Sequence, residues 1–138
     1  MSGRCSVPNT VTDAPVTLEW QRFATLTSAR TTVPLHACVY VQAAPHGVPV
    51  RVGMTSQGLA IRYRGGTGYA VDAAMHGSGN WVFVAPVPAN VCDAMARELI
   101  WQGRSVLTYN TVGKGEPPVQ RLTLHHSGTP PVFDHFQP

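Results

Sequence analysis

The chain has 138 residues, the size of one compact domain, and 43% of them are hydrophobic, which is enough for a core. Charged residues make up only 12%, and this composition excludes a disordered chain, which needs high net charge and little apolar content. The formal net charge of +3 is compatible with an anionic partner but is too small to demonstrate one. Nine of the ten basic side chains are arginines, which suits a phosphate-facing protein, although a GC-rich coding bias explains the same composition.

The three cysteines, Cys5, Cys38 and Cys92, lie far apart and form neither a zinc motif nor a disulfide framework. A reducing cytoplasm is therefore the expected location. The N-terminus lacks the apolar stretch of a signal peptide, and no stretch approaches the ~20 apolar residues of a membrane span. We therefore expect no membrane partner.

The first part of the chain predicts a loose arm that contains one short helix. Residues 1–16 are polar and contain two prolines. Residues 17–26 place apolar side chains at roughly helical spacing. We therefore assign residues 1–34 to an N-terminal arm.

Two β-branched segments predict an antiparallel hairpin. Residues 37–43 and 48–54 are rich in valine, and the turn-forming sequence Pro45-His46-Gly47 separates them. A short helix is expected over 59–64. The glycine-rich residues 65–80 predict an irregular loop.

The second half of the chain predicts one more strand and the clearest helix. The strand is expected over 80–85. The helix is expected over 89–102, where a proline and an asparagine give a start signal and Gly103 gives a stop. Short strands over 106–108 and 121–124 could close the domain.

These elements predict an α+β fold with a small, mostly antiparallel sheet flanked by helices. We expect one domain over residues 35–126, which follows the N-terminal arm of residues 1–34. Residues 127–138 contain three prolines and should form a tail on the surface.

Five features stand in a fixed order on the predicted elements. The first strand carries Cys38-Val39-Tyr40, and Arg51-Val52-Gly53 starts eleven residues beyond the tyrosine. Arg62 follows nine residues after that glycine on the short helix. Glu98 lies on the later helix before a Leu-Ile pair, and Asn110 comes twelve residues after it. The order, spacing and elements of these features resemble the GIY-YIG nuclease family.

The resemblance covers residues 35–112 and includes two departures from the family pattern. Cys38 replaces the first glycine of the first triplet. Arg51 replaces the tyrosine of the second triplet, which in the family lies near the reaction centre. Tyr40 would then supply the phenol alone, and Arg51 would add positive charge.

The resemblance implies a metal-dependent nuclease that hydrolyses phosphodiester bonds, with DNA favoured over RNA as the substrate. Such a reaction needs an activated water and stabilisation of both the developing negative charge and the leaving oxygen. One Mg²⁺ or Mn²⁺ ion on Glu98 would supply the last two, because Mg²⁺ often uses only one or two protein carboxylates. The alternative is that Glu98 forms an ion pair, for example with Arg104.

Tyr40 would act as general base or proton relay. Arg51 and Arg62 could make the phenol acidic enough to act near neutral pH. Arg62 would also contact the scissile phosphate and stabilise the transition state. The alternative is that Tyr40 is a core aromatic residue and Arg62 belongs to a solvated helix face.

Four further residues are assigned to nucleic-acid binding: Arg64, His76, Asn110 and Lys114. Arg64 would contact the phosphate backbone, and His76 could return from the glycine-rich loop as an acid or base. Asn110 would brace the site or fix a loop. Lys114 lies between two glycines in a loop whose backbone N–H groups could lie near phosphate. A structural or solvated role is the alternative for each.

Two other hypotheses remain beside the nuclease. The chain could be a catalytically degenerate domain that binds nucleic acid without cutting it, or a domain that binds a partner protein. The nuclease needs Tyr40, Arg62 and Glu98 to converge on one cleft, whereas a Glu98 held in an internal salt bridge favours the other two hypotheses. Because no separate DNA-binding module is present, specificity would need loops, a homodimer or a partner protein.

Overall fold

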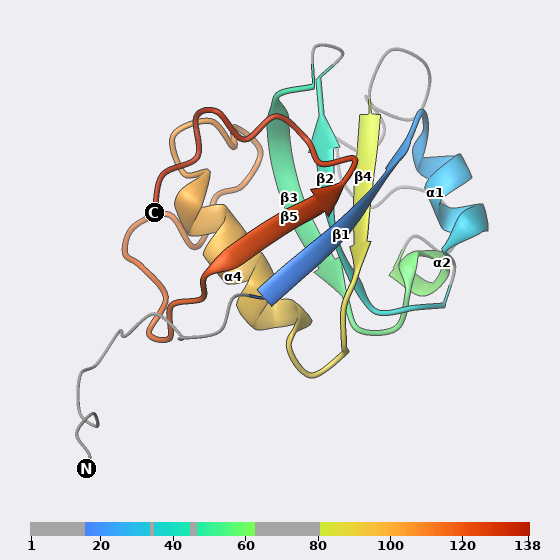
Figure 1. The fold of residues 1–138 in the computed structure, drawn as a ribbon, viewed down its shortest axis with the longest axis horizontal. Helices are drawn as coiled ribbons and strands as arrows, with labels where there is room; N and C mark the ends of the chain where they lie inside the picture. The colour runs from blue at the N-terminus through green and yellow to red at the C-terminus, as the bar shows by residue number, and fades with distance from the viewer. Residues whose placement is uncertain (1–15, 34, 45–46, 63–80) are drawn as a thin grey trace.

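The computed structural model describes residues 16–33, 35–44, 47–62 and 81–138 (Figure 1). In chain order the elements are β1 (Val16–Phe23), α1 (Leu26–Thr32), β2 (Cys38–Ala43), β3 (Pro49–Thr55), α2 (Leu59–Arg62), β4 (Trp81–Pro86), α4 (Cys92–Gln102) and β5 (Leu124–Gly128). They form an α+β fold around a five-stranded sheet of order β3-β2-β4-β1-β5. Among the strands of the described residues, only the β1–β5 pair is parallel, so the predicted mostly antiparallel sheet is confirmed.

The predicted hairpin forms one side of this sheet, with β3 at its edge. β2 pairs antiparallel with β3 and, on its other side, with β4. Every residue of β2 is buried, because both faces of the strand are covered. The strands predicted over 37–43, 48–54 and 80–85, and the helix predicted over 89–102, match β2, β3, β4 and α4 to within three residues.

The helix predicted over 59–64 is present as α2, which the structure describes as far as Arg62. The loop predicted over 65–80 and the polar residues 1–15 lie outside the described residues.

Residues 16–23 form a strand, and the helix predicted over 17–26 is wrong. Leu18 and Trp20 are buried and alternate with exposed polar neighbours. Burial therefore repeats every two residues, which is characteristic of a strand. The helix in this region begins only at Leu26. Thr25 caps it, because its hydroxyl oxygen accepts a hydrogen bond of 3.0 Å from the backbone N–H of Ser28.

The C-terminal segment differs from the prediction in two places. Residues 106–108 form a turn instead of a strand. β5 begins at Leu124 instead of residue 121, so the boundary predicted at residue 127 falls within this strand. The tail is not confined to the surface, since Phe133 and Phe136 pack against the main core.

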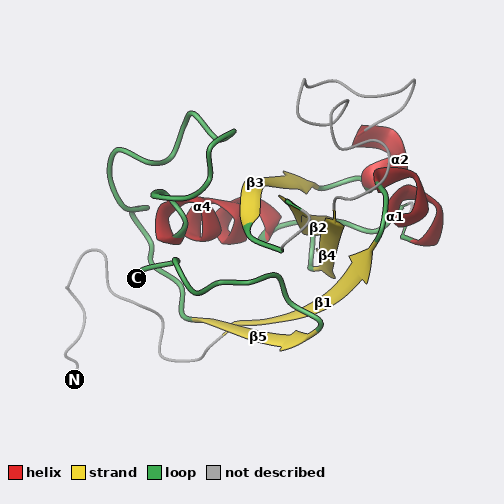
Figure 2. Cartoon of the chain, turned by 90° about the horizontal axis from the view of Figure 1, so that it is seen from above, coloured by secondary structure: helices red, strands yellow, loops and turns green. Residues whose placement is uncertain are grey.

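The sheet separates two hydrophobic clusters (Figure 2). Val39 and Val41 of β2 pack with the buried residues of α4, on the side that we call the α4 face. Tyr40, between them in sequence, packs with residues of α1 and α2, on the side that we call the α1–α2 face. Alternate residues of one strand therefore belong to opposite sides of the molecule. Among the described residues, no helix has the length and apolar character needed to cross a membrane.

Candidate functional site

Tyr40 is fully buried on the α1–α2 face, opposite Gly53 on β3. A Cβ atom at Gly53 would lie 2.5 Å from both Cζ and Oη of Tyr40. The tyrosine ring therefore occupies the space that a side chain would need. This close approach explains physically why the last position of the second triplet is a glycine.

Arg51 lies beside Tyr40 on the same face. Its guanidinium carbon is 5.8 Å from the centroid of the tyrosine ring, within cation–π range. Nη1 of Arg51 donates a hydrogen bond of 2.9 Å to Oε1 of Gln42, which stands opposite it on β2. Arg51 is 8% exposed and Gln42 is fully buried. The hairpin register thus assembles a buried phenol, a guanidinium and an amide on one side of the sheet.

The helices that cover this face are basic. α1 carries Arg30, and α2 ends at Arg62 directly beside α1. None of α1, α2, β2, β3 and β4 carries an acidic residue. The acidic residues that the structure describes lie on β1, on α4 and in the C-terminal segment: Glu19, Asp93, Glu98, Glu116 and Asp134. Glu19 alternates along β1 with Leu18 and Trp20 of the α4 face, so it points to the other side of the sheet. The elements of the α1–α2 face therefore carry three arginines and no carboxylate, with Glu19 of the neighbouring strand β1 on the same side of the sheet.

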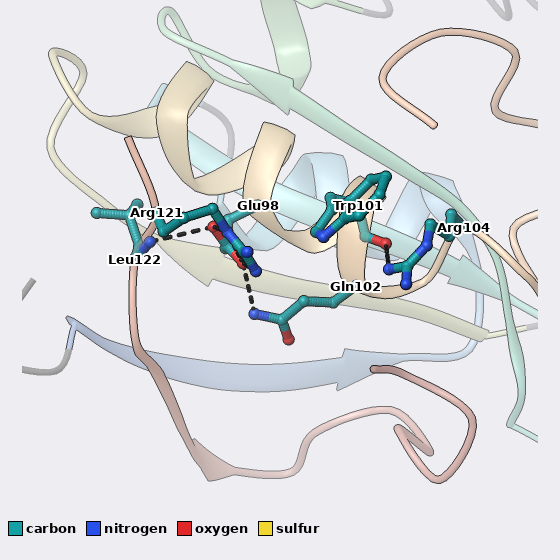
Figure 3. A network of polar contacts seen from close by, with 6 residues as sticks. All are labelled: Glu98, Trp101, Gln102, Arg104, Arg121 and Leu122. Carbon is teal, nitrogen blue, oxygen red and sulfur yellow. Dashed lines mark hydrogen bonds and ion pairs between the residues drawn. The ribbon is translucent and has the colours of Figure 1, made fainter. Parts of the chain in front are cut away.

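Glu98 lies across the sheet from Tyr40, on the face covered by α4, and has no exposed surface. Figure 3 shows the groups that surround its carboxylate. Arg121 donates to both oxygens, with the shortest contact, from Nη2 to Oε2, at 2.8 Å. Gln102 donates to Oε2 at 2.8 Å, and the backbone N–H of Leu122 donates to Oε1 at 3.1 Å. Both oxygens are therefore occupied by protein donors.

These donors decide the ionisation of Glu98. Burial of the carboxyl group raises its pKa, but the hydrogen bonds from Arg121, Gln102 and Leu122, together with the charge of Arg121, outweigh burial and hold the pKa below its ordinary value. A charged, fully hydrogen-bonded carboxylate has no oxygen available for a hydrated cation. The surroundings of Glu98 do not fit the predicted Mg²⁺ or Mn²⁺ ion.

The side chains of Asn110 and Lys114 fix the segment after α4. Both residues were predicted to bind nucleic acid. The Asn110 amide accepts from the backbone N–H of Val52 at 2.8 Å and donates to the Val52 carbonyl at 3.0 Å, as a neighbouring strand would. Lys114 Nζ donates to the carbonyl oxygens of Leu107 and Asn110. Asn110 thus fixes a loop, one of the two roles expected of it.

The remaining predicted residues lie partly outside the described part of the chain. Arg64 and His76 lie outside the described residues. In the part of the chain that the structure describes, no group of three or more His, Cys, Asp or Glu side chains could hold a metal ion. His126 accepts a hydrogen bond of 3.0 Å from Trp20 and stacks on Phe133, so it belongs to the packing of the C-terminal segment.

The structure brings together only part of the predicted site. Tyr40 and Arg51 are neighbours, and Arg62 lies on a helix that covers the same face. Glu98 does not join them, because the sheet lies between the two clusters. The sequence left an ion pair open for Glu98, but no local pattern marks Arg121, which lies 23 residues further along the chain, as the partner.

Comparison of the chain with protein-family models, with curated proteins and with solved structures finds no match. The resemblance to the GIY-YIG family therefore stays a prediction. Function has to be inferred from the chemistry of the two faces.

Proposed function

We propose that the chain is a catalytically degenerate, GIY-YIG-like domain that binds nucleic acid through its α1–α2 face. The segregation of charge carries this proposal: Arg30, Arg51 and Arg62 belong to elements of one face, and none of these elements carries an acid. Arginine forks bind phosphate oxygens in pairs, and nearby carboxylates would repel a polyanion. Glu98, which a nuclease would need on its metal, is bound by Arg121 on the other face.

Phosphodiester hydrolysis is the second candidate. The contact between Arg51 and Tyr40 favours it, because it brings two residues of the predicted catalytic set together. The metal would then have to be held without Glu98. Catalysis is therefore the less supported of the two functions.

Binding can be tested by fluorescence anisotropy with labelled single-stranded, duplex and branched DNA and RNA over a series of NaCl concentrations. Affinity should fall with salt, because phosphate contacts release counterions. Arg30→Ala and Arg62→Ala should each weaken binding to all sequences and reduce the salt slope by about 1. Arg97→Ala on α4 is the matched control and should leave binding unchanged. Absence of binding, or an equal loss in the control, would refute the proposal.

Cleavage should be assayed on the same oligonucleotides and on plasmid DNA, with Mg²⁺ or Mn²⁺. We expect no metal-dependent cutting. If wild type cuts, Tyr40→Phe is the decisive variant, because it keeps the buried ring and removes only the hydroxyl group. Cutting that this variant abolishes would establish the nuclease in place of the binding domain.

A further inference from the structure

A groove runs along the outer surface of α4, away from the sheet. It consists of two adjoining cavities of about 580 Å³ and about 280 Å³, which share Arg97, Pro118 and Val119 as lining residues. One wall is the solvent side of α4, and the other is the segment 113–120. The larger cavity lies in the size range of binding sites for small ligands. We refer to it as the α4 groove.

The outer wall of the α4 groove is fixed at both ends. At its start, Lys114 Nζ donates to the carbonyl oxygens of Leu107 and Asn110, at 2.9 and 3.0 Å. At its end, Arg121 forms the buried ion pair with Glu98 (Figure 3). Between these anchors, residues 115–120 form no hydrogen bond with the described part of the chain. The wall thus stands apart from α4 while both of its ends are attached.

The groove presents three charged side chains with unused hydrogen-bonding capacity, Arg97, Glu116 and Asp93. Nε of Arg97 donates to Asp93 at 2.7 Å, and this contact orients the guanidinium group on the helix surface. Its two terminal nitrogens have no partner among the described residues. Glu116 lines the larger cavity, and its exposed carboxylate likewise has no partner there. Asp93 lines the smaller cavity, and its Oδ1 has no partner among the described residues. A ligand therefore meets one cation and two anions.

Apolar side chains lie beside these charges. Pro117 and Pro118 line the larger cavity, and Val119 lines both cavities although 85% of its surface is exposed. Val112, just before the groove, is 74% exposed. An exposed cluster of apolar side chains bordered by charges is typical of a protein-binding surface.

We propose that the α4 groove binds an extended peptide segment of a partner protein. The segment would place a carboxylate on Arg97, an aliphatic side chain against Pro118 and Val119, and a cation on Glu116. A nucleic acid is a poorer match, because the lining carries two carboxylates against one guanidinium and a run of phosphates has no cation to place on Glu116. The fixed wall lowers the cost of ordering the site on binding. This inference does not depend on the proposed nucleic-acid binding, which uses the opposite face.

The probe is a library of random linear heptapeptides, displayed on phage and selected on the immobilised full chain. Selected sequences are then synthesised with a fluorophore, and their affinity is measured by anisotropy. The variants are Arg97→Ala and Glu116→Lys. The controls are Arg30→Ala on the α1–α2 face and Glu19→Lys on β1, which change the same charges away from the groove.

The proposal predicts enriched peptides that combine an acidic, an aliphatic and a basic residue. Arg97→Ala should weaken their binding by about tenfold, as expected for loss of a charged hydrogen bond. Peptides selected on the Glu116→Lys variant should carry an acidic residue at the position where peptides selected on wild type carry a basic one. Lack of enrichment, or equal binding to variants and controls, would overturn the proposal. A dimer in sedimentation that Val119→Asp dissociates would also overturn it, by assigning the groove to a second copy of the chain.

Discussion

Glu98 illustrates how a fully buried charge is retained in this protein. Its carboxylate accepts hydrogen bonds from two side chains and one backbone N–H, which come from α4 and from the segment before β5. Removal of Arg121 would leave the Glu98 carboxylate buried without a charged partner. The ion pair with Arg121 therefore joins two parts of the chain that are 23 residues apart.

Glu98→Ala should lower the free energy of unfolding by about 1–3 kcal/mol, because the partly buried Arg121 and the Gln102 amide would lose their acceptor. Urea denaturation followed by tryptophan fluorescence measures this change. Arg97→Ala removes the exposed pair with Asp93 and is the control, which should barely shift the midpoint. A Glu98→Ala variant as stable as wild type would show that the buried pair adds no stability.

His126 should make stability depend on pH. Burial, and secondarily the charge of His125, lowers the pKa of His126 to about 4 in the folded protein, below the value of about 6.5 for a free histidine. Protonation would also remove the acceptor that Nδ1 offers to Trp20. The unfolded chain therefore binds this proton first, so the contribution to stability is complete above pH ~6.5 and is lost as the pH falls towards ~4.

His126 should lower the free energy of unfolding by about 1–2 kcal/mol between pH 7 and pH 4. This is less than the free energy that corresponds to the whole pKa shift, because the ring is only half-buried. Urea titrations of wild type and His126→Gln at several pH values measure it. The variant should lose most of the pH dependence above pH ~5. Below that range Glu98, whose folded pKa is depressed, adds a further loss as its carboxylate is protonated. An unchanged profile in His126→Gln would contradict the assignment.

At the scale of elements, the approach of β2 to β3 depends on a glycine. Gly53→Ala should destabilise the fold by about 1–3 kcal/mol or more, because the new Cβ would overlap the ring of Tyr40. Gly115→Ala is the matched control, since no heavy atom lies within 4 Å of a Cβ at that position. Thermal unfolding of the two variants compares them directly. Equal melting temperatures would argue against a tight contact between the strands.

The outer edge of β3 is covered at Val52 by the side chain of Asn110. The amide pairs with both backbone groups of Val52, which protects an edge that would otherwise be open to another strand. Asn110→Ala should speed hydrogen exchange at the Val52 amide by about tenfold and leave the amides of β4 in the sheet centre nearly unchanged. Exchange followed by NMR tests this. Uniformly faster exchange would indicate global destabilisation instead.

At the scale of the whole molecule, the sheet separates two surfaces with different chemistry. The α1–α2 face is basic, whereas the α4 groove combines both charges with apolar side chains. Arg62→Ala should weaken nucleic-acid binding and leave peptide binding intact, and Arg97→Ala should do the opposite. Energetic effects at distant sites without shared partners normally add, so the double variant should show the sum of both losses. A loss of both activities in either single variant would contradict separate surfaces.

The elements with strong local patterns were predicted correctly. β2, β3 and β4 are β-branched segments bounded by turn residues, and α4 has a clear apolar stripe before Gly103. β1 was predicted as a helix because Leu18, Phe23 and Leu26 fall loosely at helical spacing, whereas the buried residues of the strand are Leu18 and Trp20. The segment is a strand because it pairs with β4 and β5. These partners lie about 60 and 100 positions away in the chain, so the pairing leaves no local signal in the sequence.

The sequence by itself determined the α+β class, the hairpin and, through the pairing of its strands, the meeting of Tyr40, Gly53 and Arg51, because hairpin contacts are local in the chain. Only the tertiary structure decided that Glu98 faces Arg121 across the sheet from Tyr40. The side of a sheet on which a helix packs depends on the connections between elements and on which distant residues can satisfy a buried charge. The spacing of a motif along the chain reveals neither the connections nor the partner of the buried charge.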